Sequence, residues 1–288
     1  KELVVDGDAT GIALSSGTDE EGGVVYDLRN TVYTGANYSL TGSTGYPGSG
    51  SFNTDGTKFF ITSVENSEIY QYTLSTAFNP TTISGSSSSF STSSKELYPR
   101  TVIFNSDGTK MYVVGNSSTV YQYALSSAFD VTSASFSDDF NFFAGTVQCI
   151  RFNPAGTKFF LGYSSGLKEY TLSTAFDLSS KSYDRELSNS VYENGAIKDL
   201  NFNSDGTQLY ILKSSELFKF DLGTAYSLIN TTSFVSKISV SSQESDSAGL
   251  LFNTDLSNLY LWGNTNDKIF KYSLDPRFNL KAADYMGN

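Results

Sequence analysis

The chain has 288 residues, of which 39% are hydrophobic and 15% aromatic, so it carries enough apolar material for a sizeable core. Its formal net charge of −11 opposes the binding of nucleic acid through a broad basic face. The chain has no histidine and a single cysteine, Cys149. This composition removes the commonest general base and metal ligand, and it excludes an internal disulfide.

A unit of about fifty residues recurs along the chain. Each copy begins with Phe-Asn-x-Asp-Gly-Thr-Lys or a close variant, continues with a short apolar run and ends in an aromatic-x-Leu segment. Five clear copies begin at Phe52, Phe104, Phe152, Phe202 and Phe252. A degenerate copy precedes them at residues 5–11, Val-Asp-Gly-Asp-Ala-Thr-Gly. Repeats of this period that read as strand, turn, strand, turn are typical of a β-propeller with one blade per copy.

We therefore predict an all-β, six-bladed β-propeller that forms a single domain over residues 1–288. The blades are expected to start near residues 1, 46, 98, 146, 196 and 246. Each blade would hold four antiparallel strands. In the blade that starts near residue 98, these strands fall at residues 98–104, 110–114, 120–125 and within 133–142, separated by turn-forming Asn, Asp, Gly and Ser residues.

The sequence leaves two ways to close the ring. If every blade is continuous in sequence, Lys281 to Asn288 supply the outer strand of the last blade. Alternatively, an N-terminal strand at Glu2–Val5 completes the last blade and latches the ring.

The third strand of each copy carries an aromatic residue with a leucine two positions later. The aromatic residues are Tyr26, Tyr72, Tyr123, Tyr170, Phe220 and Tyr272. A spacing of two places both side chains on one face of a strand. We expect them to pack between neighbouring blades, because a carbohydrate-stacking site would not need to recur in every blade. Cys149, within an apolar stretch, is likewise expected to be a small buried side chain.

The Asp-Gly turns are predicted to be hairpin turns rather than calcium sites. Their aspartates are Asp55, Asp107, Asp205 and Asp255. Calcium takes six to eight oxygen ligands, whereas each turn offers one aspartate, and Ala155 replaces it in one copy without loss of the motif. No metal and no cofactor are predicted.

The two faces of the predicted propeller differ in sequence. One face carries the Asp-Gly turns and the Ala-Phe turns, with Lys58, Lys110 and Lys158 just after the former, and we call it the repeat-turn face. The opposite face carries the loops between the second and third strands and the connections between blades. This variable face is where the copies diverge, so we expect the partner to bind there.

Two groups of residues on the variable face are candidate ligand contacts. The loop at residues 16–23 holds Asp19, Glu20 and Glu21, which are suited to a cation or a basic partner, although an acidic run is more often only a solvated loop. The entrances to the first strands hold Tyr46, Tyr98 and Arg100. Tyrosine and arginine dominate recognition hot spots, but Tyr-Pro pairs can equally shape the connections between blades.

No catalytic residues are predicted. The Ser-x-Asp-x-Gly-x-x-Trp box of sialidases is absent, and the single tryptophan, Trp262, falls in the second strand of the last blade. A carboxylate-dependent hydrolase would need two converging acids at the channel mouth, and no such pair is evident in the sequence.

Residues 104–115 (Phe-Asn-Ser-Asp-Gly-Thr-Lys-Met-Tyr-Val-Val-Gly) and 120–130 (Val-Tyr-Gln-Tyr-Ala-Leu-Ser-Ser-Ala-Phe-Asp) resemble a β-propeller repeat family. Such repeats are found in bacterial surface proteins and in bacteriophage structural proteins. A more distant resemblance is to TolB-like and lactonase-like propellers. The resemblance covers nearly the whole chain. It implies binding and display, and it supplies no catalytic residue.

These observations predict a non-enzymatic binding or adhesion module, extracellular, on a cell surface or on a virion. With only 17% charged residues, the surface must be covered largely by Ser, Thr, Asn and Gly, as in many secreted β-proteins. No apolar run approaches the length of a membrane span, and the initial Lys1 is consistent with a processed protein or a fragment. The expected partner is a cell-surface glycan or protein. The alternatives are a structural subunit that packs against copies of itself in a filament or virion and, less favoured, a carboxylate-dependent hydrolase.

Overall fold

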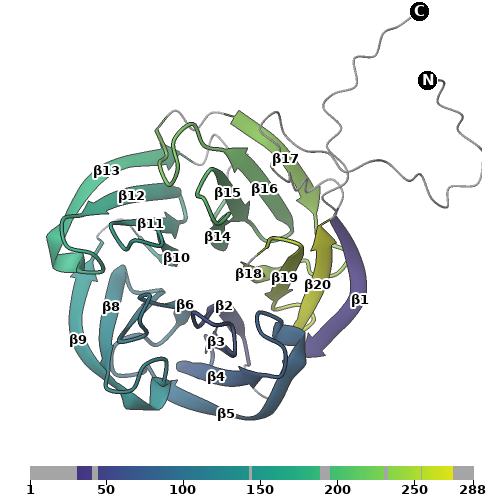
Figure 1. Cartoon of the computed structure of the whole chain (residues 1–288), viewed down its shortest axis with the longest axis horizontal. Coiled ribbons are helices and arrows are strands. Elements are labelled where there is room, and N and C mark those ends of the chain that lie inside the picture. The colour runs from purple at the N-terminus through teal and green to yellow at the C-terminus, as the bar shows by residue number, and fades with distance from the viewer. Residues whose placement is uncertain are drawn as a thin grey trace, which may run out of the picture.

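Four-stranded sheets radiate from a central axis in the fold of this chain, as the blades of a propeller (Figure 1). The computed structural model describes residues 31–40, 45–142, 145–188, 195–229, 233–253 and 255–274. These residues form five antiparallel blades. The first strand of each blade lies nearest the axis, and the last strand lies at the periphery (Figure 1).

Four blades are continuous in sequence. Blade 1 consists of β2 (Pro47–Phe52), β3 (Lys58–Ser63), β4 (Glu68–Leu74) and β5 (Ile83–Ser91). Blade 2 consists of β6 (Pro99–Phe104), β7 (Lys110–Gly115), β8 (Thr119–Leu125) and β9 (Ala134–Asn141). Blade 3 consists of β10 (Val147–Phe152), β11 (Lys158–Tyr163), β12 (Gly166–Leu172) and β13 (Lys181–Ser188). Blade 4 consists of β14 (Asp199–Phe202), β15 (Gln208–Leu212), β16 (Glu216–Asp221) and β17 (Ser233–Ser239). Short 3-10 helices precede the outer strands of the first three: η2 (Pro80–Thr82), η3 (Val131–Ser133) and η4 (Leu178–Ser180).

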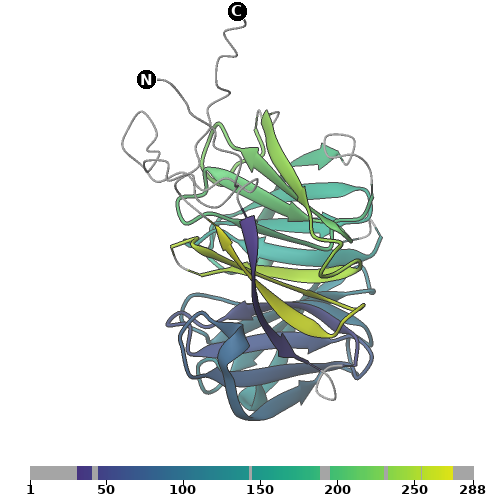
Figure 2. The ribbon, with the colours of Figure 1, turned by 90° about the vertical axis from the view of Figure 1, so that its right-hand side faces the viewer.

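Blade 5 combines the two ends of the described chain. Its inner strands are β18 (Ser247–Phe252), β19 (Asn258–Gly263) and β20 (Lys268–Leu274), and its outer strand is β1 (Thr31–Ser39). β1 runs antiparallel to β20, with Thr31 opposite Leu274 and Ser39 opposite Lys268. Figure 2 shows β1 crossing the outer edge of this blade. The ring is therefore latched by a strand from the N-terminal side.

The prediction of six blades is wrong. Blade 5 packs directly on blade 1, where the Trp262 indole nitrogen donates to the Gly48 carbonyl at 2.6 Å and its ring meets Phe59 edge to face at 5.6 Å. The physical reason lies in β1, which a six-blade arrangement would use as the outer strand of a first blade but which pairs with β20 instead. The degenerate copy, Glu2–Val5 and Lys281 to Asn288 lie outside the described residues.

The Asp-Gly segments form tight hairpin turns held by their own side chains. In blade 2 the side-chain oxygen of Asn105 accepts the backbone N–H of Lys110 at 2.8 Å. The Asp107 carboxylate accepts the backbone N–H of Thr109 at 2.9 Å. Gly108 supplies the positive φ of 72° that the turn requires. The same contacts recur around Asp55. These carboxylates are used in turn formation, which confirms the hairpin interpretation.

The Ala-Phe turns pack on the Asp-Gly turns of the same blade. Phe129 adopts a positive φ of 54° and donates its N–H to the Gly108 carbonyl at 3.0 Å. A Cβ atom on Gly108 would lie 2.3 Å from the Phe129 ring, so glycine is required by space as well as by conformation. This contact places both kinds of turn on one face, as predicted.

Lys58 and Lys110 have a structural role that their repetition did not reveal. The Lys58 ammonium donates to the carbonyl of Phe129 in blade 2 at 2.7 Å, and the Lys110 ammonium donates to that of Phe176 in blade 3 at 3.1 Å. Each lysine therefore binds the Ala-Phe turn of the next blade. These contacts join blade 1 to blade 2 and blade 2 to blade 3.

The core lies between blades, where the third-strand aromatics are buried. Tyr72, Tyr123, Tyr170, Phe220 and Tyr272 are each at most 7% exposed, whereas Tyr26 lies outside the described residues. Tyr170 stacks on Phe159 with ring centroids 4.7 Å apart. Cys149 is fully buried, and burial raises the pKa of its thiol. The prediction that these side chains belong to the core is confirmed.

The turn aspartates predict a loss of stability in acid. Hydrogen bonds from Thr57, Thr109 and Ser257 lower the pKa values of Asp55, Asp107 and Asp255. A carboxyl group with a lowered folded pKa contributes stability above its unfolded pKa of about 4, and that stability is lost as the pH falls through the folded value. We expect the urea concentration at the unfolding midpoint to decrease as the pH is lowered below about 4. Between pH 6 and 8 it should show no histidine-dependent step, since the chain has no histidine.

The triple variant Asp55→Asn, Asp107→Asn, Asp255→Asn tests the origin of this acid dependence. The asparagine oxygens can still accept the turn hydrogen bonds but do not titrate, so the urea midpoint should change less between pH 5 and pH 2.5 than in the wild type. The control is Asp138→Asn, Asp139→Asn, at two exposed positions of β9. Equal pH profiles for the triple variant and the wild type would contradict the prediction.

Candidate functional site

A buried ion pair lies in the central channel of the ring, between its two mouths. The Arg151 guanidinium, from β10, lies 2.9 Å from the Asp199 carboxylate at the start of β14. Arg151 also donates to the Ser49 hydroxyl at 3.1 Å and to the Gly50 carbonyl at 3.3 Å, both in β2. Asp199 accepts the backbone N–H of Leu250, in β18, at 3.0 Å. The pair thus connects four of the five blades at the axis.

Burial disfavours the charges of this pair, and each charge is stabilised by the other. Asp199 is fully buried and Arg151 is 8% exposed. Burial raises the pKa of Asp199, while the Arg151 charge and the hydrogen bond from Ser49 oppose that shift. Because both groups are occupied with each other and with strand backbone, we assign them a structural role. Neither residue was singled out as a site residue from the sequence.

The mouth on the variable face carries a ring of polar and aromatic side chains. The Arg100 guanidinium lies 5.8 Å from the centroid of the Tyr46 ring, within the range of a cation–π contact. The Tyr46 hydroxyl donates to the Asp246 carboxylate at 3.2 Å. Lys198 contacts the other oxygen of Asp246 at 3.1 Å, and the Asn264 amide donates to Asp246 at 2.9 Å. Side chains from four blades therefore meet at this mouth.

The electrostatics of this mouth centre on Asp246. Partial burial acts to raise its pKa, but the Asn264 hydrogen bond and the Lys198 charge outweigh it, so the pKa of Asp246 is lowered. Partial burial and the nearby Asp246 carboxylate raise the pKa of Tyr46, which therefore stays protonated as a hydrogen-bond donor. The mouth itself is nearly closed, with a hollow of only about 10 Å³ between residues such as Gly48, Arg100 and Lys198. It presents a platform rather than a pocket.

The predicted ligand contacts differ from one another in where the structure places them. Tyr46 and Arg100 come together at the mouth. Tyr98 is 50% exposed and stands beside Leu97, which is 56% exposed, so an apolar element adjoins the platform. The buried Glu96 carboxylate fixes this segment by accepting the Tyr98 backbone N–H at 2.9 Å. Asp19, Glu20 and Glu21 lie outside the described residues.

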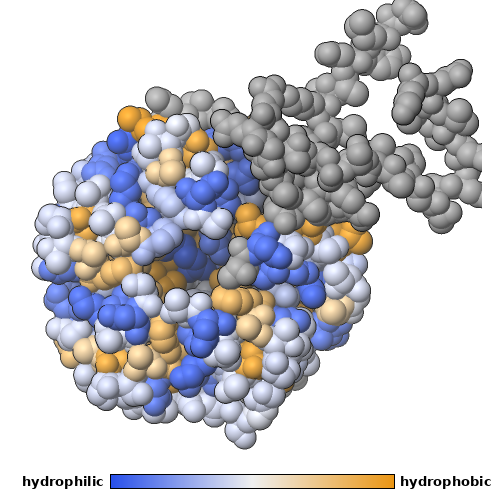
Figure 3. Space-filling view, viewed as in Figure 1, coloured by the Kyte–Doolittle hydropathy of each residue, from blue (hydrophilic) through white to orange (hydrophobic). Residues whose placement is uncertain are grey.

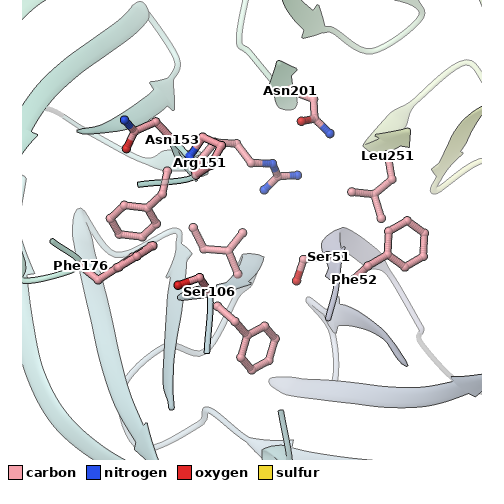
Figure 4. Close-up of a pocket in the computed structure, with 12 residues that line it drawn as sticks. Ser51, Phe52, Ser106, Arg151, Asn153, Phe176, Asn201 and Leu251 are labelled. Carbon is pink, nitrogen blue, oxygen red and sulfur yellow. The ribbon is translucent and has the colours of Figure 1, made fainter. Parts of the chain in front are cut away.

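The mouth on the repeat-turn face holds a cavity that the sequence reading missed. It has a volume of about 330 Å³. A hollow is visible at the centre of the ring in Figure 3, and Figure 4 shows the lining side chains. Arg151 and Asn201 reach toward the middle, and Phe52 and Phe176 lie on opposite sides. A second cavity of about 320 Å³ adjoins it and shares Arg151, Phe152, Pro154 and Asn201.

A signal for this cavity was present in the repeat itself. The residue directly before the repeat phenylalanine occupies the same place in every blade and faces the channel. Its occupants are Ser51, Ile103, Arg151, Asn201 and Leu251. The five side chains differ completely although the motif around them is constant. Comparing the copies position by position would have found this ring of residues.

Metal binding and membrane spanning find no structural support in the described part of the chain. Within these residues, no group of three or more Cys, Asp or Glu side chains is arranged to hold a metal ion. No helix among them is long and apolar enough to cross a membrane. No protein-family model matches the chain, and no curated protein matches it in sequence.

Proposed function

We propose that this protein is a non-enzymatic binding module, extracellular or displayed on a virion, that recognises a cell-surface glycan or protein through its variable face. The observation that carries the proposal is the exposed platform formed by Tyr46 and Arg100, with Tyr98 beside it. Tyrosine and arginine combine a large contact area with hydrogen bonding, and both are enriched among binding hot spots. The hollow between Gly48, Arg100 and Lys198 is only about 10 Å³, far below the volume of a small-molecule pocket, so we favour a macromolecular ligand.

Two further features support a binding role over catalysis. Asp246, the acid at this mouth, is held by Tyr46, Lys198 and Asn264, so its carboxylate is committed to the platform. The platform also rests on a fixed scaffold. The β2 strand that follows Tyr46 is bound at the axis by Arg151, and the Thr62 hydroxyl of blade 1 donates to the Arg100 backbone carbonyl of blade 2 at 3.2 Å. A preorganised surface loses little entropy on binding.

The variant Arg100→Ala tests the proposal. We expect it to weaken binding about tenfold, the usual effect of truncating a hot-spot arginine, while the thermal midpoint stays unchanged. Binding of the labelled protein to a glycan array and to intact cells provides the measurement. The control is Lys268→Ala, which removes an exposed charge from β20, in the periphery of the ring. If Arg100→Ala binds every target as the wild type does, the platform is not the binding surface.

A second candidate function is that of a structural subunit that packs against copies of itself. Exposed aromatic residues recur on the outer strands, with Phe136 43%, Tyr183 53% and Phe234 48% exposed. The outer strands also present unpaired edges, although a bulge interrupts each of them where it pairs with its neighbour. Sedimentation velocity distinguishes the two functions, because a subunit of this kind associates as its concentration rises and a monomeric binding module does not.

A further inference from the structure

The cavity on the repeat-turn face has the size and lining of a small-molecule site. Its volume of about 330 Å³ lies within the range of ligand pockets and accommodates a single six-membered ring with a substituent. Its walls are largely apolar. Phe52 and Phe176 lie on opposite sides with Leu251 near Phe52, and Phe104 and Phe152 also line the cavity. Aromatic side chains in this arrangement can pack against both faces of a flat ring.

The polar groups of the cavity are mainly hydrogen-bond donors. The Ser51 hydroxyl is buried and has no hydrogen-bond partner among the described residues. The side-chain oxygen of Asn201 already accepts the backbone N–H of Phe202 at 2.9 Å. The side-chain NH₂ group of Asn201 is therefore the part that remains for a ligand. The Arg151 guanidinium already donates hydrogen bonds within the protein through its two Nη atoms. A ligand that supplies an acceptor oxygen would satisfy the Ser51 and Asn201 donors.

The charge balance of the cavity favours a neutral ligand. Among the residues that line it, Arg151 is the only charged one, and Asp199 neutralises it. No lining carboxylate is present to hold a cation. The net charge of −11 on the chain opposes the approach of an anion.

We propose that this cavity binds a neutral, ring-bearing carbonyl compound such as an aromatic amide. The ring packs among the phenylalanines, and the carbonyl oxygen accepts from Ser51 and Asn201. This site is separate from the platform on the variable face, because it lies at the opposite mouth and shares no lining residue with the hollow there. Its ligand is independent of the glycan or protein partner proposed above.

The experiment is a ligand-observed NMR titration with benzamide, benzoate and benzylamine, which share a ring and differ in charge. We expect benzamide to bind saturably with a Kd of about 1 mM, a normal affinity for a ligand of this size, and to bind more tightly than the two charged analogues. Ser51→Ala should weaken benzamide binding about fivefold with little loss of stability, since the hydroxyl donates no hydrogen bond within the described residues. Ser106→Trp, at an exposed lining position, should fill the cavity and abolish binding.

The control variant is Phe136→Ala, which removes an exposed phenylalanine from β9, far from the cavity lining. It should bind benzamide as the wild type does. The proposal is overturned if benzamide does not saturate, if benzylamine or benzoate binds as tightly, or if folded Ser51→Ala retains full affinity. If Ser106→Trp does not fold, Ser51→Ala still decides the question. The Arg100→Ala variant should leave benzamide binding intact, which separates this test from that of the platform.

Discussion

Asp199→Ala is expected to lower the free energy of unfolding by about 3–5 kcal/mol, because it leaves the Arg151 guanidinium buried without its counter-ion. The same change removes the acceptor of the Leu250 N–H in β18 and of the Leu200 N–H in β14. Buried donors without partners carry a further cost. A loss of this size is a large fraction of the stability of an ordinary domain.

Urea unfolding of three variants separates the contributions at this position. Asp199→Asn retains an oxygen acceptor for the backbone donors but removes the charge, so its loss should be smaller than that of Asp199→Ala. Asp138→Ala, on the exposed side of β9, is the matched control and should change the midpoint little. A loss below about 1 kcal/mol for Asp199→Ala would show that the ion pair does not hold the ring together.

The local parts of this fold could be predicted because they are encoded in neighbouring residues. The Asn105 and Asp107 side chains accept backbone N–H groups of the same turn, and Gly108 supplies its positive φ, so the motif alone specifies a hairpin. The spacing of two residues between Tyr123 and Leu125 likewise specifies a buried face within one strand. The aromatic-x-Leu pair recurs in all five described blades and the complete Asn-x-Asp-Gly turn in three of them, which is why strands, turns and core could be assigned from the sequence.

The number of blades could not be predicted, since it depends on a pairing between residues far apart in the chain. The sequence of Thr31–Ser39 does not indicate whether this strand pairs with strands next to it in the chain or with β20. The choice is made by packing, where Tyr33 covers Phe270 and Tyr272 at centroid distances of 5.8 and 5.6 Å. A degenerate copy of the repeat at residues 5–11 therefore suggested a blade that the closed ring does not require.

The site was predictable in part for a related reason. The variable face attracted attention because its loops differ in length and composition, and Tyr46 and Arg100 do meet there. The repeat-turn face carries the same kinds of turn in each copy, so no ligand contact is predicted there from the sequence. Its turns are indeed alike, but each blade contributes a different side chain to the channel, so five similar blades build an asymmetric cavity. Divergence at a single position within a constant motif is a weak signal in sequence and a strong one in space.

Two truncations test how the ring is closed. A chain that begins at Thr31 retains β1 and all five blades, so we expect its urea midpoint to match that of the full chain. A chain that begins at Leu40 lacks β1, which leaves the hydrogen-bonding edge of β20 unpaired and exposes Phe270 and Tyr272. The lost ladder and aromatic burial should reduce the free energy of unfolding by about 5 kcal/mol or more.

The comparison of these two chains decides between five and six blades. If residues 1–30 formed an essential blade, the chain that begins at Thr31 would lose as much stability as the shorter one, which would contradict the five-blade ring. Hydrogen exchange adds a local readout, since the amides of β20 should lose protection in the shorter chain only. Tyr33→Ala in the full chain provides a milder test. It should cost about 2 kcal/mol, because the Tyr33 ring is only partly buried against blade 5.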